Sequence, residues 1–134
     1  MRISRRLVDE MVAHAREDLP NECCGLLGGR DGVATTVYRA RNHFASPLRF
    51  GVHPDDLFRI TQKELPGRDE ELVAIYHSHT KSAAYPSQTD LNEAQNSWPE
   101  AMWVIVSLED PGSPDVKGFW LNDLRIADAE LIVE

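Results

Sequence analysis

The residues with the clearest chemical potential lie in one segment, which runs from His77 to Asp90. An apolar run at residues 72–76 comes directly before it and predicts a buried strand. Because side chains two residues apart on a strand point to the same face, His77 and His79 are expected to project side by side where the strand ends. A loop then returns the carboxylate of Asp90. Two imidazoles and one carboxylate make a three-ligand set, which leaves a fourth tetrahedral position open for water, as in catalytic zinc sites.

The same segment also has a purely structural interpretation. Ser87-x-x-Asp90 matches a capping box, the pattern in which two side chains satisfy the free backbone N–H groups at a helix start. The two histidines would then be ordinary residues at a strand end. Short motifs carry a real risk of false matches, so this segment alone leaves both interpretations open.

Titratable residues outside this segment have structural interpretations of their own. Glu22 begins an apolar strand, and on local sequence we expect a solvated carboxylate, because exposed carboxylates are the rule. His43 and His53 show no ligand spacing, which favours surface or packing roles. The adjacent Cys23 and Cys24 form neither a disulfide framework nor a C-x-x-C half-site, so we expect buried free thiols that pack as small apolar groups.

Length and composition predict a single domain that spans residues 1–134. The hydrophobic fraction of 42% and the charged fraction of 27% are those of a soluble globular protein. No run approaches the ~18 apolar residues of a membrane helix, and the N-terminus lacks the apolar core of a secretory signal. A net charge of -8 argues against a nucleic-acid partner. We therefore expect a cytoplasmic enzyme with neither a membrane nor a nucleic-acid partner.

Hydrophobic periodicity and turn residues predict an alternation of helices and strands. The expected elements are a helix capped by Ser4 and ended by Pro20-Asn21, strands at 23–27 and 35–38 around a turn at 28–32, a helix from Pro54 to Leu65 closed by Pro66-Gly67, the strand at 72–76, a helix at 87–97, and strands at 102–108, 116–121 and 124–133. This order predicts the α/β class, in the form of an α+β sandwich whose mixed β-sheet is packed between helices.

The combined motifs resemble those of the JAMM (MPN-plus) metalloprotease family. Its signature is an early Glu, then His-Ser-His, ten residues and Asp, usually with Pro-Ser just before that Asp. Here the matching residues are Glu22, His77-Ser78-His79 and Pro86-Ser87-x-x-Asp90. One departure is Thr80, which stands where many members have proline after the second histidine. The resemblance covers nearly the full chain, implies a JAB/MPN-like domain, and favours the metal site over the structural interpretation.

The resemblance also implies a role for each motif residue. His77, His79 and Asp90 would bind one zinc ion per chain, with water as the fourth ligand. Glu22 would be the general base that takes the proton of this water and delivers it to the leaving amine. Ser87 would cap its helix and also donate its hydroxyl hydrogen to the developing oxyanion. Ser78, which points to the opposite face, would be structural.

Within the family, the chain resembles the compact bacterial sulfur-carrier-protein–cysteine peptidases. The shared features are the Glu-x-Cys-Gly-Leu-Leu strand, the loop Asn42-x-x-x-Ser46-Pro47-x-x-Phe50 and the segment around His77. The implied partner is a small ubiquitin-like sulfur carrier protein, from whose C-terminal Gly-Gly the enzyme would release an amino acid, typically cysteine. The loop at 42–50 is our candidate for one wall of the substrate groove, with Ser46 and Arg49 as candidate binding residues.

Three other functions stay open at this point. A deubiquitinase-like isopeptidase would remove ubiquitin-like proteins from lysines, although the chain is too short for the insertions of the animal relatives that act in this way. A non-haem iron oxygenase uses the same two-histidine, one-carboxylate set, but gives no role to Glu22. A catalytically silent binding module could share the fold. The oligomeric state also stays open, with a homodimer among the options.

Overall fold

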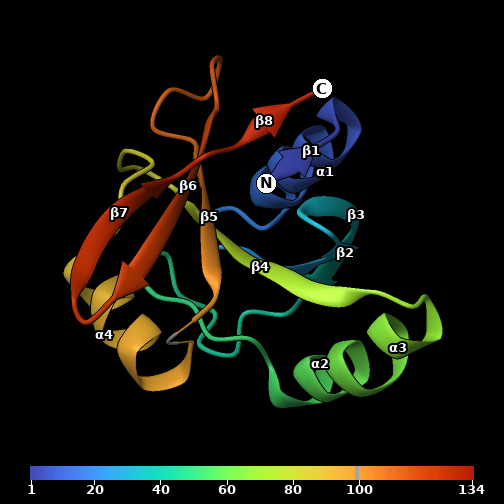
Figure 1. Ribbon diagram of the computed structural model, residues 1–134. Coiled ribbons are helices and arrows are strands. Elements are labelled where there is room, and N and C mark those ends of the chain that lie inside the picture. The colour runs from blue at the N-terminus through green and yellow to red at the C-terminus, as the bar shows by residue number, and fades with distance from the viewer. Residues whose placement is uncertain (99) are drawn as a thin grey trace.

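One curved β-sheet organises the chain, with helices on both of its faces (Figure 1). The computed structural model describes residues 1–98 and 100–134. Within these residues the strands are β1 (Arg2–Ile3), β2 (Cys24–Arg30), β3 (Val33–Ala40), β4 (Glu71–His79), β5 (Met102–Ser107), β6 (Asp115–Asn122), β7 (Arg125–Ala129) and β8 (Ile132–Val133). The helical elements are α1 (Arg5–Glu17), α2 (Pro54–Arg59), the π-helix η1 (Ile60–Glu64), α3 (Leu65–Gly67) and α4 (Gln88–Ser97).

The sheet is mixed, with the order β7-β6-β5-β4-β2-β3-β1-β8. The parallel pairs are β4 with β5, β1 with β3 and β1 with β8, whereas the other neighbours are antiparallel. Strands β7 and β8 lie at opposite edges although only Glu130 and Leu131 separate them. Because so short a connection spans at most about 11 Å, the sheet must curl until its edges approach each other.

Each face of the sheet has its own apolar core. Helix α1 covers one face with an apolar stripe that includes Leu7 and Met11. The other face is covered by η1, α3 and α4, which contribute Ile60, Leu65 and Ala94. The predicted class, a mixed sheet packed between helices, is confirmed. No helix within the described residues has the length and apolar character needed to cross a membrane.

The predicted turn between the first two long strands is shorter than expected. Gly28 and Gly29 continue β2, and only Asp31 and Gly32 form the turn, both with positive φ angles of 55° and 77°. The two glycines serve close packing instead of a turn. A Cβ on Gly29 would lie 1.9 Å from the carbonyl oxygen of Val33, and one on Gly28 would lie 2.7 Å from the side chains of Leu65 and Tyr38. Irregular pairing beside Gly28 and Gly29 lets the strand bend there.

The chain ends also differ from the prediction. The single strand expected at 124–133 is two strands, because the chain leaves β6 after Ala129 and continues as β8 along β1. Strand β1 was not predicted, since two residues are too few for a periodic pattern.

The second predicted helix continues through Gly67, because the wider π turn lets the Leu65 N–H reach the carbonyl of Ile60 and accommodates Pro66.

Candidate active site

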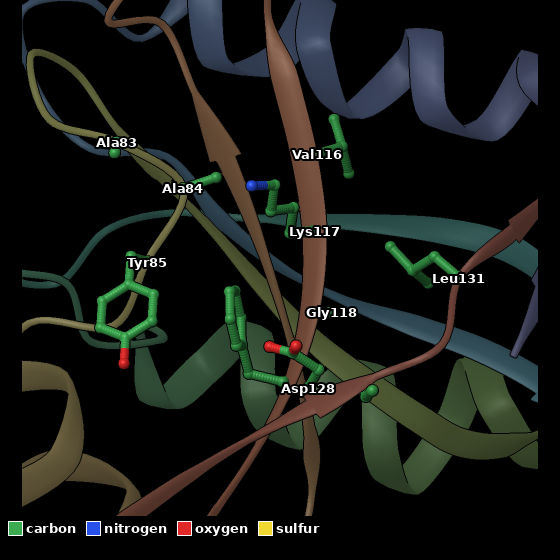
Figure 2. A pocket seen from close by; sticks show the side chains of 10 residues that line it. Ala83, Ala84, Tyr85, Val116, Lys117, Gly118, Asp128 and Leu131 are labelled. Carbon is green, nitrogen blue, oxygen red and sulfur yellow. The ribbon is translucent and has the colours of Figure 1, made fainter.

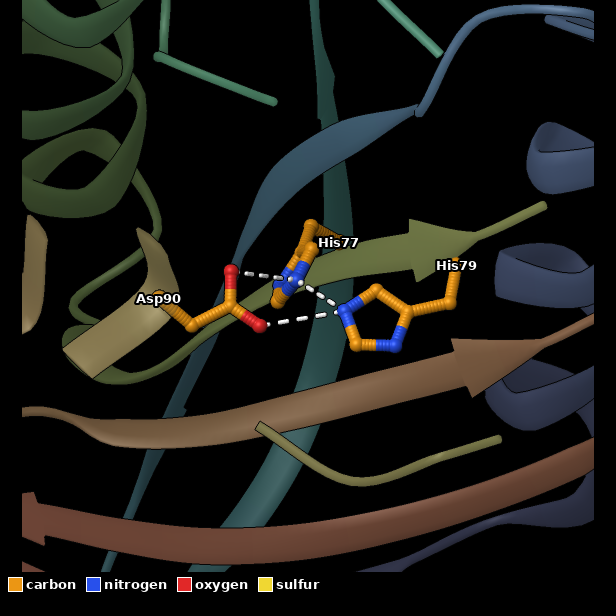
Figure 3. Close-up of side chains that lie close together, drawn as sticks. All are labelled: His77, His79 and Asp90. Atoms are coloured by element: carbon orange, nitrogen blue, oxygen red, sulfur yellow. Dashed lines mark hydrogen bonds and ion pairs between the residues drawn. The ribbon is translucent and has the colours of Figure 1, made fainter. Parts of the chain in front are cut away.

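Strand β4 presents two histidines at its carboxyl end, on the face of the sheet that α4 covers. His77 and His79 are only 0% and 4% exposed. The first turn of α4 adds Asp90, so that one ligand atom from each of the three residues lies within 4.8 Å of the others. The Asp90 carboxylate faces both rings, with Oδ1 3.1 Å from His77 Nε2 and Oδ2 3.0 Å from His79 Nε2 (Figure 3). The structure therefore brings the three predicted ligands together.

A capping box holds Asp90 in place. Its backbone N–H donates to Ser87 Oγ over 3.0 Å, and the backbone N–H of Ser87 donates to Asp90 Oδ2 over 3.0 Å. The predicted cap and the predicted metal site are thus compatible, because a carboxylate oxygen has a second lone pair. The hydroxyl of Ser87 accepts in this contact, so its hydrogen remains free to donate.

The loop between the two ligand segments orients the second histidine. His79 Nδ1 lies 2.8 Å from the carbonyl oxygen of Ala83, which directs Nε2 toward Asp90. Burial disfavours a charge on Asp90 and on His79. Even so, His77, His79 and the Ser87 N–H hold the pKa of Asp90 below its usual range. The hydrogen bonds to Asp90 and Ala83 likewise outweigh burial and raise the pKa of His79.

Glu22 lies beside this cluster and is buried, not solvated as local sequence suggested. Strands β2 and β4 pair Cys24 with His77, and continuing this register places Glu22 opposite His79. Its Oε1 has no hydrogen-bond partner among the described residues. Burial raises the pKa of Glu22 to about 8, an effect that His79 opposes and Asp90 reinforces. The pKa of this carboxyl group is therefore close to the pH at which a general base works best.

The loop at 42–50 is tied to Glu22 by backbone contacts. The Glu22 N–H donates to the carbonyl oxygen of Ser46 over 2.9 Å, and Asn42 Nδ2 donates to the Glu22 carbonyl over 3.0 Å. Asn42 also bonds Arg49 O, Phe44 N and Gly51 N, so one side chain organises the whole loop. Sequence reasoning placed Asn42 in a loop motif but missed this function, because its partners are backbone atoms.

The two candidate binding residues in this loop have defined surroundings. The Ser46 hydroxyl accepts from the backbone N–H of Leu48 over 3.1 Å, within the loop itself. The guanidinium of Arg49 is exposed and lies 3.7 Å from the centre of the Phe44 ring. The hydroxyl of Thr80 (Oγ1) donates to the carbonyl oxygen of Pro47 over 3.5 Å, so the loop bridges the segments that carry Glu22 and His79.

The remaining titratable residues lie outside the cluster. The ring of His43 packs edge-on against that of His53, and His53 accepts from the Asp55 N–H at the start of α2. Cys23 and Cys24 are buried free thiols, as predicted, and burial raises the pKa of Cys23 to about 12. Ser78 accepts from the Cys23 N–H over 2.8 Å, which agrees with its predicted structural role.

A groove of about 630 Å³ lies next to the loop that joins the ligands. Figure 2 shows Tyr85 on one side of it, Leu131 on the other, and Lys117 and Asp128 between them. Its wall includes Ala83, whose carbonyl orients His79. The groove is therefore close in the chain to the site, but none of the three clustered ligands lines it.

The donor set fits a divalent metal ion. Two neutral imidazole nitrogens and a carboxylate, all buried, are ligands that suit zinc, and three protein ligands are the number found in catalytic zinc sites. Without an ion, two Nε2 atoms 3.2 Å apart face the same carboxylate. Glu22 adds a fourth ionisable group that offers no atom to this cluster and so remains available as a base.

Comparison with known proteins agrees with this geometry. A sequence model for prokaryotic homologs of the JAB domain matches residues 4–122. The CysO-cysteine peptidase of Mycobacterium tuberculosis is 36% identical in an alignment of 129 positions that covers 91% of this chain and 83% of that protein. The desampylase of Pyrococcus furiosus is 30% identical over 114 residues, or 84% of this chain and 76% of that protein.

A solved structure matches along the whole chain. The solution structure of a protein from Desulfitobacterium hafniense has a TM-score of 0.90 at 33% identity, and the match covers 99% of this chain and 92% of that one. The matched family segment, residues 4–122, contains Glu22, both histidines and Asp90. This chain therefore belongs to the family of prokaryotic JAB-domain proteins, the family of JAMM type that its motifs resemble.

Proposed function

We propose that this protein is a zinc-dependent metallopeptidase. Its substrate would be the amide bond between the C-terminal Gly-Gly of a ubiquitin-like sulfur carrier protein and one added amino acid, cysteine by our hypothesis. The observation that carries this proposal is the convergence of His77, His79 and Asp90 beside the buried Glu22. The similarity to a CysO-cysteine peptidase supports the substrate class.

His77 Nε2, His79 Nε2 and a carboxylate oxygen of Asp90 would hold one zinc ion per chain. When bound, the ion supplies a water molecule of lowered pKa and polarises the scissile carbonyl. The protein contributes the orientation of the ligands. The Ala83 carbonyl sets the ring of His79, and the capping box sets the carboxylate of Asp90.

Two further groups move or stabilise charge in this proposal. Glu22 accepts a proton from the attacking water and passes it to the leaving amine, a task that suits a carboxyl group whose pKa burial raises to about 8. Ser87 donates its free hydroxyl hydrogen to the developing oxyanion.

Selectivity would come from the approach to the site, because the chemistry itself can cut any accessible amide. A Gly-Gly tail has no side chains and can enter a groove too narrow for other peptides. The loop at 42–50 is the proposed wall, since its backbone is fixed to Glu22 at Ser46 and to Thr80 at Pro47. Arg49 is exposed on this loop and would attract the terminal carboxylate of the departing residue.

Mass spectrometry of a carrier–Gly-Gly–cysteine adduct tests this proposal. Incubation with the zinc-loaded protein is expected to remove one cysteine residue and leave the carrier ending in Gly-Gly. The Asp90→Ala variant and a chelator-treated sample serve as controls. An intact adduct after incubation with protein that contains stoichiometric zinc would refute the assignment.

A second candidate function is an isopeptidase that acts on ubiquitin-like conjugates of lysine. The similarity to a desampylase favours it. The same assay with a lysine isopeptide conjugate separates the two functions. Efficient cleavage of that conjugate, with the cysteine adduct untouched, would move the assignment to the isopeptidase.

A further inference from the structure

The two clustered histidines are held in place by different means. His79 has a hydrogen bond from Nδ1 to the Ala83 carbonyl. His77 is fully buried, and among the described residues no atom is a hydrogen-bond partner of its Nδ1. Ring orientation of a metal-binding histidine is normally set by such a bond to its second nitrogen. Something else must therefore orient the ring of His77.

Two aromatic residues enclose the imidazole of His77. The ring of Phe50 is stacked on it, with the ring centres 4.3 Å apart and an angle of 16° between the planes. Trp103 meets it edge-on from β5, with centres 5.4 Å apart and an angle of 86°. Phe50 and Trp103 also contact each other, with ring centres 5.4 Å apart. All three side chains are buried, so the imidazole plane has little room to turn.

We propose that Phe50 is a positioning residue for the metal centre. With Trp103 it forms an aromatic clamp that holds the His77 ring with Nε2 toward His79 and Asp90. Rotation of a histidine ring about its second side-chain torsion is otherwise broad, and stacking on a flat ring restricts it. The proposal rests on the proposed function, since it concerns the same metal site.

The position of Phe50 gives the clamp a second consequence. Phe50 is the last residue of the loop at 42–50, whose backbone Asn42 holds through the carbonyl of Arg49 and the N–H of Gly51. The same loop is bound to the backbone of Glu22. One segment thus fixes both the candidate base and the plane of a candidate ligand.

Zinc affinity of the metal-free protein tests the clamp. Phe50→Leu removes the flat ring but keeps an apolar side chain, and Phe50→Met does so with a more adaptable one. The matched control is Phe119→Leu, because Phe119 is buried in the same apolar core and does not stack on either histidine. Competition with a chromogenic chelator is expected to show zinc binding weakened by roughly 10–100-fold in the Phe50 variants and by less than about threefold in the control.

A second measurement needs no metal. Imidazole proton and nitrogen NMR signals of His77 in the metal-free protein report its ring environment directly. They are expected to shift strongly in Phe50→Leu and Phe50→Met, and little in Phe119→Leu. Thermal unfolding of the metal-free variants shows how much each substitution weakens the core in general.

The results separate this proposal from the function on which it rests. Equal zinc affinity in Phe50→Leu and wild type, or equal weakening by Phe119→Leu, would overturn the clamp. If wild type itself bound no zinc, the proposed function would fail. The His77 signals would then still decide the clamp, because unchanged signals in both Phe50 variants contradict it.

Discussion

Two carboxylates, Glu22 and Asp56, are almost equally buried but have opposite environments. Glu22 is 5% exposed, and its Oε1 has no partner among the described residues. Asp56 is 7% exposed and accepts from the backbone N–H and the guanidinium of Arg41, with Arg59 3.5 Å away. Burial raises the pKa of Glu22 to about 8, whereas the hydrogen bonds from Arg41 lower the pKa of Asp56 to about 2.

This difference distinguishes a structural carboxylate from a candidate catalytic one. The buried charge of Asp56 is fully paired. It ties the residue that follows β3, Arg41, to α2 and has no capacity left for proton transfer. A buried carboxyl group without partners costs stability, but it can exchange a proton near neutral pH. The candidate ligand Asp90 is a third case, since contacts with the two histidines and with the Ser87 N–H keep its pKa low despite burial.

The largest expected effect comes from removing a ligand. We expect Asp90→Ala and His77→Ala to lose both bound zinc and hydrolytic activity, because two remaining ligands cannot hold a catalytic ion. Metal analysis of the purified protein and the adduct assay measure the two losses. Stoichiometric iron with oxygen consumption in wild type, and no hydrolysis supported by zinc, would favour an oxygenase instead.

Substitution of the unpaired carboxylate is expected to separate binding from turnover. Glu22→Gln keeps the shape of the side chain but cannot accept the proton, so zinc should be retained while kcat falls by roughly 10²–10⁴-fold. The exposed Glu130→Gln is the matched control, with activity unchanged. A fully active Glu22→Gln enzyme would remove Glu22 from the role of general base.

Ser87 is expected to give an intermediate effect on rate. Ser87→Ala should retain zinc and lower kcat by roughly 10²–10³-fold, because the oxyanion loses one donor. Part of any loss could come from the helix cap, since the Asp90 N–H donates to Ser87 Oγ. Ser87→Thr restores both the hydroxyl donor and the cap and is expected to recover most of the rate. A rate for Ser87→Ala equal to that of wild type would exclude the oxyanion role.

The paired carboxylate should affect stability and its dependence on pH. Asp56→Asn is expected to lower the free energy of unfolding at pH 7 by about 1–3 kcal/mol, because charged hydrogen bonds are lost. The folded-state pKa of Asp56 is depressed, so its contribution is present above the ordinary value of 3.8 and disappears as the pH falls toward about 2. Urea unfolding at pH 7 and pH 2 measures this contribution to the free energy of unfolding. The control is Asp69→Asn, because the Asp69 side chain is 94% exposed and its loss should change that free energy little.

In the metal-free protein, the stability that depends on Glu22 is expected to change with pH in the direction opposite to that of Asp56. The pKa of Glu22 is raised, so the associated stability is fully present below the ordinary value of 4.5 and is lost as the pH rises toward about 8. Glu22→Gln should therefore raise the free energy of unfolding at pH 8 by about 1–2 kcal/mol, with a smaller gain below pH 4.5. If Glu22→Gln instead destabilised the protein at pH 8, the charge of Glu22 would have stabilising partners, as that of Asp56 has. The contrast between the two carboxylates would then disappear.

Local patterns in the chain were enough to predict the features that depend on short-range geometry. A strand repeats every two residues, so His77 and His79 had to share a face. The capping box links residues three apart, so Ser87 and Asp90 had to meet at the helix start. The amphipathic stripe of α1 and the mixed sheet followed from the same local patterns.

Features that join distant segments depend on how the chain packs in three dimensions. The Glu22 side chain is buried because β2 pairs with β4 and the loop at 42–50 lies against its backbone. The ring of His77 is enclosed because Phe50 and Trp103 arrive from two other parts of the chain. Periodicity describes which face a side chain takes but not what packs against that face. The pKa of Glu22 and the orientation of His77 therefore depend on contacts that local sequence does not encode.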